Sequence, residues 1–163
     1  METGRYVEGI NEEMEFEVKP EVFLDSAKKI LEKYQEHKRR IEELEKEYEE
    51  LKNKYGWSDY EIQHVTKYIN TRWVKNKIGM KYTYCWYVEY DSQERKIIKN
   101  VYIGAIVPEE IQKEIEDFKK AKMLRKIIKR VREEFRKIEW RIIAIQMNMN
   151  TVLKDLETFK IPE

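Results

Sequence analysis

The chain has 163 residues, of which 40% are charged and 41% are hydrophobic. The 33 basic residues nearly balance the 32 acidic ones, so no overall field attracts nucleic acid or a membrane surface. The single cysteine, Cys85, excludes an internal disulfide, and no apolar run approaches the ~20 residues of a membrane-spanning helix. We therefore expect a soluble protein with one domain, or a helical rod that carries a small head. Its expected location is the cytoplasm, or the virion or host cytoplasm if its source is viral.

Residues 1–19 are expected to form an N-terminal extension. Acidic and apolar residues alternate from Glu13 to Val18, which places Met14, Phe16 and Val18 on one face. Two interpretations stay open for this segment: an edge strand on a neighbouring sheet, or a loose chain.

A long helix is predicted from Pro20 to Tyr55. Proline suits the first turn because its missing N–H would be unpaired there, and Gly56 suits the left-handed residue that ends a helix. Apolar residues recur at steps of three and four, as in one strand of a coiled coil. They are Phe23, Ala27, Ile30, Tyr34, Ile41, Leu44, Tyr48, Leu51 and Tyr55. His37 interrupts this seam and is expected to set register rather than to bind a metal.

A second helix is predicted over residues 59–77. Ser58 and Glu61 have the spacing of a capping box, in which each side chain satisfies a free N–H of the first turn. Gly79 is expected to end this helix. Its apolar face is formed by Ile62, Val65, Ile69, Trp73 and Val74.

A β-hairpin is predicted over residues 81–104, because two β-prone runs flank a short polar connection. Alternation places one set of large side chains on the same face: Tyr82, Tyr84, Trp86, Val88 and Tyr90. We expect most aromatic residues of residues 57–107, including Trp57, Trp73 and Trp86, to form a small local core, with one or two left free for a ligand.

A third helix is predicted from Pro108 to about Phe159, with Pro108 at its first position and two glutamates favoured by the helix dipole. Its apolar residues also recur at steps of three and four. They are Ala121, Leu124, Ile128, Val131, Phe135, Ile138, Ile142, Ile145, Met149, Val152, Leu156 and Phe159.

The predicted fold class is mainly α with a small β-hairpin. Residues 20–56 and 108–160 are expected to form a long antiparallel helical hairpin, a coiled coil, with residues 57–107 as a helix-plus-β-hairpin head at its tip. Pairing Tyr55 with about Glu109 leaves the end of the third helix without a partner. Its apolar residues predict a homodimer interface, with cover by the N-terminal extension as the alternative. These residues are Ile145, Met149, Val152, Leu156 and Phe159.

Charge is unevenly distributed along the two long helices. Residues 119–141 hold eleven basic residues and three glutamates, whereas residues 42–50 hold six glutamates and one lysine. In the expected register the acidic block lies opposite residues 114–122, so much of the basic run lacks acidic neighbours and becomes a candidate phosphate-binding stripe. The candidates are Arg125, Lys126, Lys129, Arg130, Arg132, Arg136 and Lys137. A solvated, salt-bridged face is the alternative.

The predicted second helix and hairpin together resemble the recognition helix and wing of winged-helix DNA-binding proteins. That resemblance implies phosphate contacts from the basic residues of the head and stacking of bases on exposed aromatic rings. The basic residues are Arg72, Lys75, Lys77, Lys81, Arg95, Lys96 and Lys99. The hairpin sequence, with Tyr82-x-Tyr84-x-Trp86-Tyr87 at its start and Tyr102-Ile103-Gly104 and Pro108-Glu109-Glu110 at its end, also resembles hairpins in small proteins of archaeal and phage mobile elements.

No glycine-rich phosphate loop, Cys or His metal spacing or nucleophile elbow is found, so no catalytic residue, cofactor or metal is predicted. The abundance of Glu and Lys, with few Cys, Gly and Pro, is typical of hot-living organisms. We therefore expect a non-enzymatic, dimeric nucleic-acid-binding protein, with DNA as its ligand, from a thermophilic archaeon or its virus or plasmid. The alternative is a structural or adaptor coiled-coil protein whose head docks a protein partner.

Overall fold

The computed structural model describes residues 17–163, so Met14 and Phe16 of the predicted N-terminal strand lie outside the described residues. The described chain is mostly helical (63%), with three helices and one three-stranded antiparallel sheet. The predicted combination of long helices with a smaller β element is thereby confirmed. Internal contacts divide the chain into two units, Met1–Arg40 and Ile41–Glu163.

Helix α2 spans Pro20–Tyr55, as the sequence predicts. It ends at Gly56, whose φ of 68° is a left-handed conformation that other residues adopt only with strain. The Trp57 N–H then donates to the Lys52 carbonyl oxygen (3.0 Å), which satisfies one of the free carbonyl groups at the end of the helix.

The predicted second helix over residues 59–77 is wrong beyond its first six residues. Helix α3 covers only Asp59–His64, and the chain continues as strand β1, Val65–Lys75. The helix start is as predicted, because the Ser58 Oγ accepts a hydrogen bond from the Glu61 N–H at 3.1 Å. The rest is a strand because Val65–Lys75 is rich in β-branched and aromatic residues, which pack well on a pleated surface. Since no helix covers residues 65–77, the winged-helix resemblance has no counterpart in the structure.

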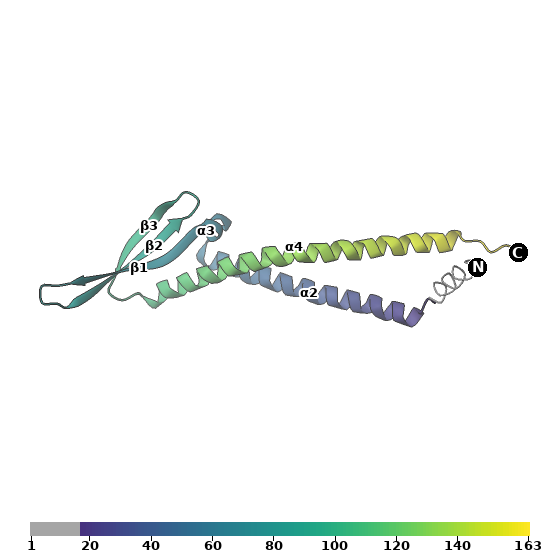
Figure 1. Cartoon of the computed structure of the whole chain (residues 1–163), viewed down its shortest axis with the longest axis horizontal. Helices are drawn as coiled ribbons and strands as arrows, with labels where there is room; N and C mark the ends of the chain where they lie inside the picture. The colour runs from purple at the N-terminus through teal and green to yellow at the C-terminus, as the bar shows by residue number, and fades with distance from the viewer. Residues whose placement is uncertain (1–16) are drawn as a thin grey trace, which may run out of the picture. The chain divides into compact units, whose positions relative to one another are not determined.

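The predicted hairpin is confirmed as strands β2, Lys81–Asp91, and β3, Lys96–Gly104 (Figure 1). The strand order is β1–β2–β3, and both pairs of neighbours are antiparallel. The two-stranded hairpin of the prediction is therefore the second half of a three-stranded meander. Irregularities in the pairing of β2 with β3 occur next to Cys85 and Glu89.

Helix α4 spans Glu109–Thr158, and Pro108 is its N-cap rather than its first residue. The hydrophobic core of the second unit lies where α4 meets α3 and the end of α2. Trp57 occupies its centre, with its ring stacked on Tyr55 (4.3 Å between centroids) and edge-on to Phe118 (5.0 Å). The buried members of this core are Tyr48, Trp57, Ile62, Val65, Phe118, Ala121 and Leu124.

Within Ile41–Glu163, α2 and α4 are in contact in a register that differs from the predicted one (Figure 1). The Tyr55 hydroxyl bonds to Asp117 at 2.5 Å, rather than lying opposite Glu109, and Lys120 pairs with Glu47 at 2.6 Å. The reason is that the first two turns of α4 pack against the sheet instead of α2. Ile115 is buried there, and Glu114 lies 3.7 Å from Lys67 of β1.

Candidate nucleic-acid interface

The shifted register brings the acidic block of α2 toward the basic run of α4. The Arg132 Nε lies 2.5 Å from a carboxylate oxygen of Glu45, and this guanidinium lowers the pKa of Glu45. Arg125 donates to Gln63 at 3.0 Å and lies 3.5 Å from Asp59. Two of the seven predicted phosphate contacts on α4 are thus engaged within the chain, where the sequence led us to expect them unpaired.

The other five basic residues of the run are exposed: Lys126, Lys129, Arg130, Arg136 and Lys137. Lys126, Arg130 and Lys137 share a face of α4 because they are spaced by four and seven, and buried Leu124 and Phe135 lie on the opposite face. Lys129 instead lines a pocket of about 430 Å³ whose wall includes Glu45 and Glu49. Fewer basic side chains of α4 are therefore free to bind phosphates than the sequence predicts.

A second basic region lies at the free end of the β1–β2 hairpin, residues 70–84, which we call the distal hairpin. Lys75 and Lys81 are paired directly opposite each other at the ends of the two strands. Like charges in that position repel and destabilise a hairpin. Lys77 in the connecting turn and Arg72 add to this charge, and no Asp or Glu occurs between Val65 and Val88.

The turn of the distal hairpin is held by Asn76. Its side-chain oxygen accepts hydrogen bonds from the N–H groups of Ile78 (3.0 Å) and Met80 (2.9 Å), and its backbone N–H donates to the Met80 carbonyl oxygen (2.9 Å). Gly79 has a φ of 85°, a conformation that glycine adopts without strain. The turn thereby presents Lys77 and Ile78 in a defined conformation, and Ile78 is 85% exposed.

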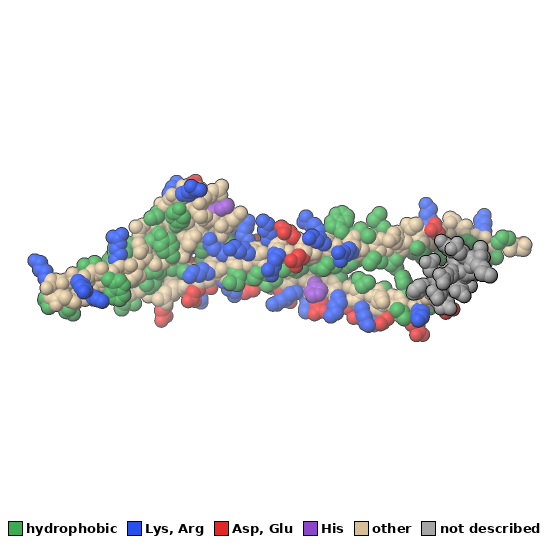
Figure 2. Space-filling model, in the orientation of Figure 1, with side chains coloured by type: hydrophobic (Ala, Val, Ile, Leu, Met, Phe, Trp, Pro, Cys, Tyr) green, Lys and Arg blue, Asp and Glu red, His purple; other side chains and the backbone are tan. Residues whose placement is uncertain are grey.

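Basic and hydrophobic side chains lie together at this free end of the hairpin (Figure 2). Trp73 is 69% exposed there, whereas Trp57 is buried in the core. Trp57 is thus buried as expected, whereas the expected place of Trp73 in a local core is wrong. Trp86 is half-buried.

The remaining basic residues predicted in the head lie toward the other end of the sheet. Arg95 is in the β2–β3 turn, and Lys96 forms an ion pair with Glu94 at 2.7 Å. The ammonium group of Lys99 stands 5.6 Å from the centre of the Tyr87 ring. The structure thus groups Arg72, Lys75, Lys77 and Lys81 in the distal hairpin and separates them from Arg95, Lys96 and Lys99.

The sequence did not reveal one cluster, because Lys67 falls within the helix that was predicted over residues 59–77. The Lys67 side chain is buried beneath the sheet and lies 3.3 Å from Glu89, 3.7 Å from Glu114 and 3.9 Å from Glu61. Its ammonium group also stands over the rings of Trp57 (5.2 Å) and Phe118 (4.8 Å). The alternation of Val65, Lys67 and Ile69 was the available signal, because period two places all three on the buried face.

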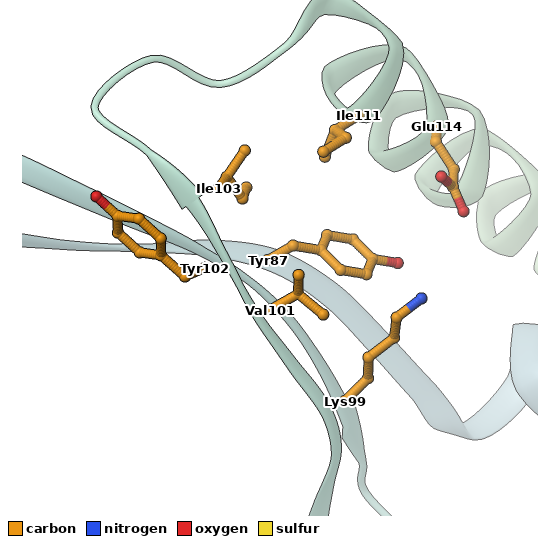
Figure 3. Close-up of a pocket in the computed structure, with 7 residues that line it drawn as sticks. All are labelled: Tyr87, Lys99, Val101, Tyr102, Ile103, Ile111 and Glu114. Atoms are coloured by element: carbon orange, nitrogen blue, oxygen red, sulfur yellow. The ribbon is translucent and has the colours of Figure 1, made fainter.

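A pocket of about 300 Å³ opens beside this cluster, between the sheet and α4. Figure 3 shows Tyr87 and Lys99 extending toward Glu114, whereas Tyr102 projects away from them. The Tyr87 hydroxyl donates to Glu89 at 2.8 Å, and burial together with this bond raises the pKa of Tyr87. Tyr87 is therefore a hydrogen-bond donor at neutral pH, not a base.

Within the described residues 17–163, no group of three or more His, Cys, Asp or Glu side chains is placed to hold a metal ion. No helix in this part of the chain has the length and apolar character needed to cross a membrane. Comparisons with protein-family models, with curated proteins and with solved structures each found no match to this chain.

Proposed function

We propose that this chain is a non-enzymatic nucleic-acid-binding protein whose main phosphate contacts come from the distal hairpin. The observation that carries the proposal is the cross-strand pair of Lys75 and Lys81. Two lysines held opposite each other cost stability unless an anion lies between them. Phosphates of a nucleic-acid backbone supply that anion, and a basic surface attracts them over a Debye length of ~10 Å.

The neighbouring sequence strengthens this proposal. Lys77 and Arg72 extend the positive charge along the hairpin, and the nearest acidic residues in the chain, Glu61 and Glu89, lie beyond it. Glu61 and Glu89 both lie within 4 Å of Lys67 and form ion pairs with it, so their charges are already balanced there. The exposed Lys126, Arg130 and Lys137 on α4 are proposed as a secondary contact. DNA is the proposed ligand, and a thermophilic archaeon, or its virus or plasmid, is the proposed source of the protein. The Lys- and Glu-rich composition supports the thermophilic source.

The test is a titration of labelled DNA with the full chain at several salt concentrations. The variant Lys75→Glu/Lys77→Glu/Lys81→Glu removes the charge of the distal hairpin. It should bind much more weakly, and the slope of log K against log salt should become shallower by about 2–3, since each lost phosphate contact contributes ~0.7–0.9.

The matched control is Lys28→Glu/Lys33→Glu/Lys38→Glu, which makes the same change in net charge on exposed lysines of α2. We expect it to retain most of the affinity of the wild type. Equal losses in the two variants would show that only net charge matters, and wild-type protein that fails to bind at low salt would reject nucleic-acid binding.

The proposal includes an antiparallel coiled coil of the two long helices and assembly as a homodimer. The three/four spacing of apolar residues supports both, and Ile145 (46%), Met149 (40%), Val152 (55%), Leu156 (66%) and Phe159 (69%) are exposed. The variant Ile145→Asp/Met149→Asp should therefore be monomeric when its mass is measured by light scattering. An unchanged mass would reject this interface.

A scaffold or adaptor role is the second candidate. It is favoured by the exposure of Ile78 (85%) and Met80 (58%) beside Trp73 in the distal hairpin, since such apolar side chains suit a protein partner. The salt titration separates the two roles, because a protein-docking head predicts no binding to DNA even at low salt.

A further inference from the structure

The two faces of the sheet have different environments. Side chains that alternate with buried Lys67 and Tyr87 point to the opposite side, which we call the open face. The strand pairing places seven large aromatic or basic side chains there, together with Val88, which is buried: Tyr68, Arg72, Tyr82, Tyr84, Trp86, Tyr90 and Tyr102. Tyr102 is 55% exposed and Tyr68 is 38% exposed. Large aromatic rings are thus available on the side of the sheet that α4 does not cover.

Three of these rings form a contiguous cluster. Trp86 lies between Tyr102 (5.5 Å between centroids, 61° between planes) and Tyr84 (6.3 Å, 41°), and Tyr84 lies 6.2 Å from Tyr102. The guanidinium carbon of Arg72 stands 5.9 Å from the centre of the Trp86 ring. Because the rings are tilted rather than stacked on each other, ring surface is left for another planar group.

The open face carries no carboxylate. Residues of β1 and β2 that alternate onto it include no Asp or Glu, and Asn100 of β3 is paired with Val88 beside the cluster. Asn70 is paired with Trp86 on the other side. Their amide groups offer both donors and acceptors to base edges. Arg72 of the distal hairpin lies on this face, whereas Lys75 and Lys81 alternate to the other side of the same two strands, so ring surface and phosphate-binding charge meet at Arg72.

We infer that the open face binds single-stranded nucleic acid, with bases stacked on Tyr102 and Trp86 and the backbone directed along Arg72 toward the distal hairpin. The inference rests on the proposed function and deepens it by naming the form of the ligand. Unpaired bases present their faces to a ring, whereas the bases of a duplex are already stacked on each other. The distal hairpin contacts only phosphates, which a single strand and a duplex both carry, so by itself it does not distinguish the two forms.

The test compares the affinities of the full chain for a fluorescein-labelled 20-nucleotide single strand of mixed sequence and for the matched duplex. Wild-type protein should prefer the single strand. Tyr102→Ala should lower the ratio of single-strand to duplex affinity by roughly fivefold to a hundredfold, which is the loss expected for one stacked base. Tyr102→Phe keeps the ring and should keep most of this preference. Trp140→Ala, which removes an exposed ring of α4, should leave the ratio unchanged.

The outcomes distinguish this inference from the proposed function. If Tyr102→Ala leaves the ratio unchanged while the triple Lys→Glu variant still binds weakly, the open face does not bind bases and the hairpin proposal stands. Wild-type protein that binds neither form at low salt overturns both. If Tyr102→Ala changes the mass measured by light scattering without affecting the ratio, the face joins copies of this chain and the inference is wrong.

Discussion

At the scale of single residues, Lys67 shows how a charged side chain can be buried. Three carboxylates lie within 4 Å of its ammonium group, and two aromatic rings flank it. Each described buried side-chain polar atom has a hydrogen-bond partner. The ion pairs of Lys67 therefore connect strand β1 to α3 through Glu61, to β2 through Glu89 and to α4 through Glu114, and these carboxylates balance its buried charge.

Lys67→Ala should destabilise the protein by about 3–5 kcal/mol, because it removes a buried cation and leaves three half-buried carboxylates close together without it. The free energy of unfolding from urea denaturation, followed by circular dichroism, measures this change. Lys126→Ala, at an exposed position of α4, should change it by no more than about 0.5 kcal/mol. A loss below about 1 kcal/mol for Lys67→Ala would contradict the role assigned to this lysine.

Local chemistry predicted several residues correctly. The cap at Ser58, the left-handed Gly56 and the alternation of β2 all follow from the properties of the residues themselves. Lys67 and Arg125 were not placed correctly, because their environment depends on which elements pack together. A lysine carries no sequence signal that it is buried unless the strand containing it has first been recognised.

At the scale of elements, strand β1 was predicted as a helix because a true helix start at Ser58 was followed by apolar residues at steps of three and four. The same residues also fit period two, and the run from Val65 to Trp73 contains few helix-favouring residues. Pairing with β2 along all eleven residues decided between the two patterns. Long-range pairing of this kind is not visible in a short window of sequence.

The short helix α3 is tied to both long helices by Asp59. Its carboxylate accepts a hydrogen bond from the Tyr48 hydroxyl of α2 (2.8 Å) and forms ion pairs with Lys52 of α2 (3.1 Å) and Arg125 of α4 (3.5 Å). These bonds lower the pKa of Asp59 below its ordinary value of 3.8, so the carboxylate stabilises the fold at neutral pH. That contribution is lost as the pH falls through the lowered pKa.

We therefore expect Asp59→Asn to lower the free energy of unfolding at pH 7 and to differ less from wild type as the pH falls below 3.8. Thermal denaturation between pH 2.5 and pH 7 measures this dependence. Glu133→Gln, an exposed position in α4, is the control and should show no such convergence. A difference for Asp59→Asn that is constant with pH would rule out the proposed linkage.

At the scale of the whole molecule, the sequence predicted that two long helices flank a β-containing head, and the order of elements agrees with it. The contact between α2 and α4 was predicted in the wrong register, because apolar spacing alone does not fix how far one helix slides along another. Packing of Phe118 against Trp57 and of Ile115 beneath the sheet fixes it within Ile41–Glu163. This shift also brings Glu45 and Arg132 together, which moves the proposed phosphate contacts from α4 to the distal hairpin.

The most direct test of that central claim is a titration of ¹⁵N-labelled protein with a short single-stranded DNA, followed in amide correlation spectra. The largest shifts should cluster at Arg72, at Lys75–Lys81 and around Tyr102, at a salt concentration where binding is measurable. Shifts confined to the basic run of α4, or spectra that do not change at low salt, would contradict the claim.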